Sequence, residues 1–129
     1  MMIVRPYANS LGVRVEQDAM SGLPLCTMPP GPRVAGDSDM LHGGALAGLL
    51  EAAAGTAVEQ SLGTTQLEVQ PVSINVDYMR KGRLVKTQAN AEIVRRGAHI
   101  VHVEATAWQD DPQRPIAVAR LVFSLRARG

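Results

Sequence analysis

Aromatic residues are scarce in this chain, which has one Trp, two Tyr and one Phe among 129 residues. Its core therefore has to be built from small aliphatic side chains. A single subunit with so few large core side chains is a first indication of an oligomer. The single cysteine, Cys26, excludes an internal disulfide framework and fits a reducing compartment. No apolar run approaches the length of about 18 residues that a membrane-spanning helix needs, and residues 1–9 lack a secretory signal. We therefore expect one domain over residues 1–129, located in the cytoplasm and without a membrane partner.

Basic residues are few in the first part of the chain, residues 1–75. Residues 76–129 carry ten Arg or Lys against five acids, whereas residues 1–75 carry three Arg against seven acids. A basic second half can receive phosphate groups, but neither interleaved aromatics nor a nucleic-acid motif accompanies it. No Cys and His residues occur at metal-ligand spacing either. The charge pattern therefore permits a polyanionic ligand, and we expect neither a nucleic-acid partner nor a metal.

Proline and glycine divide the chain into a small set of elements. One long helix is predicted over residues 43–60, which contain no proline and are rich in Ala and Leu. A short helix is predicted over residues 5–11, ahead of Gly12, and a proline-rich loop over residues 29–39. Alternation of apolar and polar residues predicts strands. In chain order these lie around residues 13–15 and 23–27 and at residues 72–78, 85–93, 100–108 and 116–125.

The order of these elements predicts an α+β fold. Four consecutive strands joined by short turns indicate an antiparallel meander. One long helix packed on a face of such a sheet gives a two-layer domain. The two short strands of the first half would complete an antiparallel sheet of about six strands.

The long helix has two contrasting sides. One side is an apolar stripe of the kind that is buried against a sheet, and it consists of Leu46, Leu49, Leu50, Ala53 and Ala57. The opposite side, here named the glycine face, consists of Gly44, Gly48, Glu51 and Gly55. Each glycine costs a helix roughly 1 kcal/mol relative to alanine. We therefore expect a large group, either a second helix or a ligand, close to the backbone of the glycine face.

The start of the long helix is a candidate binding site. His42, Gly43 and Gly44 leave the first N–H groups sterically open, and these groups lie at the positive end of the helix dipole. An oxyanion or a polarised carbonyl can bind there. Glu51 is two turns further along, about 10 Å from Gly44 in axial rise, too far for both to act on one small atom. Antiparallel packing of two subunits would bring Glu51 of one near Gly43 of the other, so we expect a site shared across a dimer interface.

Residues 41–57, LHGGALAGLLEAAAGTA, resemble the central-helix motif of hotdog-fold acyl-CoA thioesterases. The resemblance is to the phenylacetate-degradation type, related to 4-hydroxybenzoyl-CoA thioesterase. Residues 72–82 and 92–108 are similar to strands of the same family, so the resemblance covers roughly residues 8–125. It implies a hotdog fold, in which a curved antiparallel sheet wraps a long central helix. It also implies a homodimer or homotetramer that acts on acyl-CoA and has no cofactor apart from the coenzyme A of the substrate.

The resemblance assigns roles to residues of the motif. The backbone N–H of Gly43 would polarise the thioester carbonyl, and Glu51, nine residues after His42, would act as general base or nucleophile. His42, directly before Gly43, is included among the catalytic candidates. We expect it to hold the loop at the helix start rather than to transfer protons. The candidates for substrate binding are Gly44 and Asp39 near the helix start, and Arg80, Lys81, Arg95 and Arg96 for the CoA phosphates.

Two departures from the family pattern concern polar side chains. The family often has Asn or Gln six residues before the His, where this chain has Gly36. Its orienting role is therefore either absent or taken over by Ser38 or Asp39. The family also often has Ser or Thr one turn after the acid, where this chain has Gly55 and then Thr56.

The principal hypothesis is hydrolysis of an acyl-CoA thioester to free acid and CoA at a site shared between two subunits. The alternative is a non-catalytic protein of the same fold that binds acyl-CoA or another acyl ligand, and Gly36 keeps this alternative open. A hydratase acting on enoyl-CoA ranks lower, because residues 43–60 contain no Asp/His pair.

Overall fold

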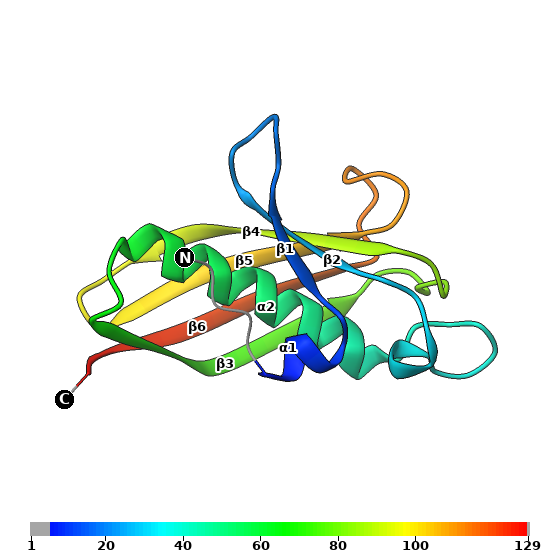
Figure 1. Ribbon diagram of the computed structural model, residues 1–129, viewed down its shortest axis with the longest axis horizontal. Coiled ribbons are helices and arrows are strands. Elements are labelled where there is room, and N and C mark those ends of the chain that lie inside the picture. Colours follow the sequence, from blue (N-terminus) through cyan, green and yellow to red (C-terminus); the bar gives the residue numbers. More distant parts are fainter. Residues whose placement is uncertain (1–5, 129) are drawn as a thin grey trace.

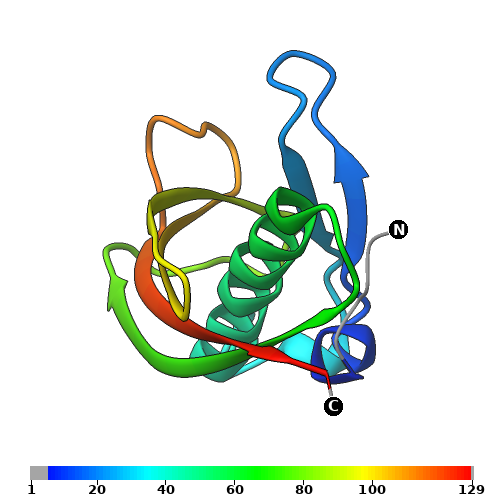
Figure 2. The ribbon, with the colours of Figure 1, turned by 90° about the vertical axis from the view of Figure 1, so that its left-hand side faces the viewer.

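A long helix, α2 (Gly43–Leu62), lies along the concave face of a curved six-stranded antiparallel sheet (Figures 1 and 2). The computed structural model describes residues 6–128. Ahead of α2 come the short helix α1 (Pro6–Ser10) and a 3-10 turn, η1 (Pro32–Val34). The strands are β1 (Arg14–Gln17), β2 (Pro24–Met28), β3 (Leu67–Tyr78), β4 (Thr87–Arg96), β5 (Ile100–Trp108) and β6 (Ala117–Ala127). The predicted α+β architecture is therefore confirmed.

The strand order β1-β2-β4-β5-β6-β3 differs from the predicted meander of four strands. Of the four strands in that prediction, only β4, β5 and β6 are neighbours in chain order, whereas β3 pairs along β6 and forms an edge of the sheet. The prediction was wrong because the connection between the strands expected at residues 72–78 and 85–93 was taken as a short turn between neighbouring strands. Instead, Gly82 lies in a longer connection, where its carbonyl accepts the N–H of Leu41 and its backbone packs against the side chains of Leu41 and Ile116.

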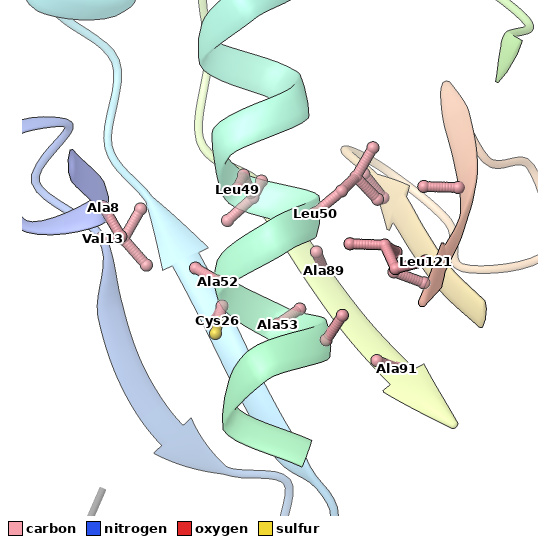
Figure 3. Packing of buried hydrophobic residues seen from close by; sticks show 14 of the residues in the cluster. Ala8, Val13, Cys26, Leu49, Leu50, Ala52, Ala53, Ala89, Ala91 and Leu121 are labelled. Atoms are coloured by element: carbon pink, nitrogen blue, oxygen red, sulfur yellow. The ribbon is translucent and has the colours of Figure 1, made fainter. Parts of the chain in front are cut away.

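The apolar stripe of α2 is buried against the sheet, as predicted. Leu46, Leu49 and Leu50 are at most 3% exposed. In Figure 3, Leu50 points toward Leu121 of β6 while Ala8 and Val13 approach α2 from its other side. Alanine and valine fill most of the remaining core, so the helix lies very close to the strands. This close packing is how a chain with so few aromatic residues fills its interior.

The glycine face is covered at Gly48 by the chain's own N-terminal segment. A methyl group at Gly48 would lie 2.6 Å from Cε2 of Tyr7 and 2.8 Å from Cδ1 of Leu11. Both distances are shorter than van der Waals contact, so the absence of a side chain is what allows α1 to pack on α2. At this position the expected large neighbour is therefore α1 and the residue that follows it.

Replacing Gly48 with alanine should destabilise the protein despite alanine's better helix propensity. Alanine gains about 1 kcal/mol within a helix, but the displaced Tyr7 ring and Leu11 side chain cost about 1–3 kcal/mol of overpacking. We expect a lower melting temperature for Gly48→Ala in a calorimetric scan. Gly43→Ala is the control, because its methyl group would meet the Tyr78 hydroxyl at an ordinary 3.5 Å. A Gly48→Ala protein as stable as Gly43→Ala would show that α1 is not packed as described.

Candidate active site at the start of the long helix

His42 is the N-cap of α2. Its backbone is extended, with φ −70° and ψ 133°, and its Nδ1 accepts the N–H of Gly44 at 2.9 Å. In the neutral ring the remaining proton is then on Nε2, so the lone pair that could take up a proton is already used by the cap. His42 therefore holds the helix start in place, and a role in proton transfer would require this hydrogen bond to break.

The N–H of Gly43 is left open by this arrangement. The N–H groups of Ala45 and Leu46 are both directed to the carbonyl of His42, and that of Gly44 to the His42 ring. Within residues 6–128 the Gly43 N–H makes no hydrogen bond, and the residue is exposed. An unpaired donor at the positive end of a helix of this length can bind and polarise a carbonyl oxygen.

Two tyrosines lie at the same helix end, and Tyr78 was not predicted as a site residue from the sequence. The Tyr78 hydroxyl donates to the carbonyl of Gly43 at 2.8 Å, and the Tyr7 hydroxyl reaches the carbonyl of Gly44 at 3.5 Å. The alternation of residues 72–78 was the available signal, because it placed Tyr78 on the apolar side of its strand. It could not show that this strand ends beside the first turn of α2.

Glu51 lies on the glycine face, partly buried, one turn beyond Gly48. Its carboxylate makes no hydrogen bond or ion pair with the residues that the structure describes. Glu51 is eight residues after Gly43, which corresponds to about 12 Å of axial rise. A single subunit therefore does not bring the Glu51 carboxylate and the Gly43 N–H to one reacting atom.

Gly36 packs tightly beside the helix start. Its N–H donates to the carbonyl of Met40 at 2.7 Å, and a methyl group at this position would lie 3.3 Å from Cα of His42. The loop then reverses through Ser38 and Asp39, which have left-handed backbone angles with φ of 49° and 61°. Both residues are exposed, and the carbonyl of Asp39 accepts the N–H of Leu84. The loop is thus built from backbone hydrogen bonds, and position 36 has little room for an orienting side chain.

The four basic candidates fall into two groups at opposite ends of α2. Arg80 and Lys81 follow β3 and help line a cavity of about 260 Å³, where Nη1 of Arg80 donates to the Pro115 carbonyl at 2.8 Å. Arg95 and Arg96 end β4, and Nη1 of Arg96 donates to the carbonyl of Ser61 at 3.2 Å. Ser61 is 18 residues after Gly43 along the helix, or about 27 Å. One subunit therefore does not gather all four residues around one ligand.

Strand β3 is an edge strand with apolar side chains in solvent. Val72, Ile74 and Tyr78 of this strand are exposed, at 61%, 38% and 53%, and so is Met79 directly after it, at 54%. A bulge at Val72 shifts the register with β6 between Pro71 and Ser73. A 12-residue edge of this kind offers unpaired backbone groups and apolar surface to another chain.

Cys26 is fully buried, and desolvation raises the pKa of its thiol to about 11, although a hydrogen bond with Thr56 acts in the opposite direction. A thiol with so high a pKa is a poor nucleophile at neutral pH. Within residues 6–128, no three His, Cys, Asp or Glu side chains are grouped to hold a metal ion. In the same part of the chain, no helix has the length and apolar character to cross a bilayer.

Comparison with known proteins identifies relatives over most of the chain. A sequence profile of the acyl-CoA thioesterase N-terminal domain family matches residues 32–124. No curated protein matches the chain. Among solved structures, a Bacillus halodurans protein crystallised with CoA is 26% identical, with a TM-score of 0.83, over 96% of this chain and 83% of that chain.

Two further structures show the same fold at lower identity. A thioesterase from Haemophilus influenzae is 23% identical, with a TM-score of 0.84, over 94% of this chain and 82% of that chain. A phenylacetic acid degradation-related protein from Ralstonia eutropha JMP134 is 19% identical, with a TM-score of 0.81, over 95% and 91%. The hotdog fold and the family resemblance predicted from residues 41–57 are thereby confirmed.

Proposed function

The chain belongs to the family of acyl-CoA thioesterase N-terminal domains, and we propose on this basis that it hydrolyses an acyl-CoA thioester to a free acid and CoA. The observation that carries the proposal is the open Gly43 N–H at the start of α2. A thioester carbonyl oxygen bound there would be polarised, and the negative charge that develops on it during attack would be stabilised. CoA as part of the ligand is supported by the Bacillus halodurans relative that was crystallised with it.

Glu51 is the general base of the proposed reaction. Its carboxylate takes a proton from water as the water oxygen bonds to the thioester carbon, and an oxyanion forms on the carbonyl oxygen beside Gly43. The carbon–sulfur bond then breaks, and the CoA sulfur takes the proton that Glu51 received. Direct attack by the Glu51 carboxylate, followed by hydrolysis of the resulting anhydride, gives the same products.

We place the reacting carbon between two subunits, with Gly43 from one and Glu51 from the other. The axial distance between these residues within a subunit supports this arrangement, as does the exposed apolar edge of β3. Pairing of two β3 edges in antiparallel fashion would run the two α2 helices in opposite directions. The Ser61 end of one helix, with Arg95 and Arg96, would then approach the Gly43 end of the other, with Arg80 and Lys81. This arrangement would bring both basic groups within reach of one CoA.

A mixed-dimer experiment tests whether the site is shared. Gly43→Pro and Glu51→Ala subunits, each inactive alone, are unfolded together and refolded. A mixed dimer would have one site without either change, so statistical mixing should restore about one quarter of the wild-type activity. If both residues acted within one subunit, every site would remain defective and no activity would return.

The activity itself is tested by thiol release from a panel of acyl-CoAs with short, long and aryl acyl groups. Wild-type protein is expected to release CoA from at least one of them, and Glu51→Ala at least about 10²-fold more slowly. The residues at the helix start would bind the thioester carbonyl and do not select the acyl group. The panel therefore also serves to identify the acyl class.

Non-catalytic acyl-CoA binding is a second candidate, favoured by one observation. Gly36 packs against the backbone of His42, so no polar side chain at this position orients water or the carbonyl. On this hypothesis wild type and Glu51→Gln bind acyl-CoA with the same Kd in calorimetry, and neither turns it over.

A further inference from the structure

The peptide group between Gly43 and Gly44 is held by a side chain on each side. Its carbonyl, that of Gly43, accepts the Tyr78 hydroxyl at 2.8 Å. Its N–H, that of Gly44, donates to Nδ1 of His42 at 2.9 Å. Two hydrogen bonds to opposite ends of one peptide group fix the orientation of its plane.

Such restraint matters here because both residues are glycines in solvent. Glycine has more backbone freedom than any other residue, and Gly43 and Gly44 have no side chains to anchor the first turn of α2. The first turn of a helix also has the fewest intrahelical hydrogen bonds. An N–H that stabilises an oxyanion must be held in its orientation before the reaction. On the N-terminal side of Gly43, part of this restraint comes from the His42 carbonyl, which accepts the N–H groups of Ala45 and Leu46. On the C-terminal side, the glycine has to be held through the peptide group that follows it.

The sheet supplies this rigidity through Tyr78. This residue ends β3 and is paired in register with Ala117 of β6. The next two N–H groups, of Met79 and Arg80, both donate to the carbonyl of Ile116, at 2.8 and 3.2 Å. The phenol is therefore presented by a fixed strand end, across 35 residues of sequence, to the first carbonyl of α2.

We propose that Tyr78 is a positioning residue for the Gly43 N–H. Its hydroxyl holds the Gly43 carbonyl, the peptide plane that follows Gly43 keeps its orientation, and the N–H of Gly43 stays directed outward toward the substrate carbonyl. The inference rests on the proposed function for its catalytic consequence, while the restraint of the helix start is a property of the protein without substrate.

Tyr7 offers a matched comparison at the same helix end. Its hydroxyl lies 3.5 Å from the carbonyl of Gly44, at the limit of a hydrogen bond, and its ring packs on Gly48. Tyr7 and Tyr78 are exposed to nearly the same extent, 55% and 53%. Loss of a tyrosine hydroxyl near α2 can thus be compared at two positions. Only the Tyr78 hydroxyl makes a short hydrogen bond to the helix start.

The test compares Tyr78→Phe with Tyr7→Phe in turnover and in amide NMR spectra. For Tyr78→Phe we expect kcat to fall about 3- to 10-fold, the worth of one hydrogen bond, with KM within twofold of wild type. The 15N resonance of Gly44 should move without any ligand, because this amide shares its peptide group with the Gly43 carbonyl. Tyr7→Phe should leave kcat and the Gly44 resonance unchanged.

A double variant separates positioning from direct contact with substrate. If Tyr78 acts through the Gly43 N–H, then Tyr78→Phe should lower kcat no further in a Gly43→Pro protein, which lacks that N–H. Additive losses, or a raised KM with unchanged kcat, would overturn the proposal in favour of substrate contact. An unmoved Gly44 resonance in Tyr78→Phe would also overturn it, and this result does not depend on turnover. Absence of turnover in wild type, by contrast, would contradict the proposed function and leave the NMR comparison to decide whether Tyr78 restrains the helix start.

Discussion

Glu51→Ala is expected to lower kcat by about 10²- to 10⁴-fold, the usual contribution of a general base. The carboxylate makes no hydrogen bond or ion pair within residues 6–128. Its removal therefore leaves no described group without its partner, and alanine suits a helix interior. Melting temperature and CoA affinity should both stay near the wild-type values. The measurement is thiol release at saturating substrate, with a thermal scan of the same preparation.

Two further variants show whether the charge of Glu51 is the cause. Glu51→Gln keeps the shape of the side chain and removes its basicity, so it should lose nearly as much activity as Glu51→Ala. Glu16→Gln makes the same chemical change on the exposed strand β1 and should be as active as wild type. An active Glu51→Ala protein would refute the mechanism, because no other carboxylate has been placed on the glycine face.

The helix and its two faces could be predicted from the sequence because they depend on local spacing. Proline-free residues with apolar side chains three and four apart identified α2 and its buried stripe. The same spacing showed that something must lie close to Gly48. It could not show that the neighbour is Tyr7 of α1, since this contact joins segments about forty residues apart.

The place of β3 in the sheet could not be predicted in this way. Strand pairing is decided by long-range contacts. The sequence of the connection that contains Gly82 does not distinguish a turn between neighbouring strands from a crossing to another position in the sheet. The error had a consequence for the site. With β3 next to β4, Tyr78 would have had no reason to lie near Gly43, whereas β3 beside β6 brings the two together. The bulge at Val72 is a further detail that strict alternation misses.

Gly43→Pro is expected to lower kcat by about 10²- to 10³-fold, the typical cost of losing one oxyanion donor, without destabilising the fold. Proline is well accommodated at the first position of a helix. The preceding residue, His42, already has the extended backbone that proline requires, with φ −70° and ψ 133°. Because the Gly43 N–H makes no hydrogen bond within residues 6–128, its loss breaks no described interaction.

Gly43→Ala is the control that distinguishes loss of the donor from steric obstruction. Alanine retains the N–H, and its methyl group would lie 3.5 Å from the Tyr78 hydroxyl, an ordinary contact. We expect its kcat to stay within a few-fold of wild type in the same thiol-release assay. Equal losses in the alanine and proline variants would mean that any side chain at position 43 blocks the substrate. Undiminished kcat in Gly43→Pro would mean that the carbonyl is polarised elsewhere, because proline has no N–H to offer it.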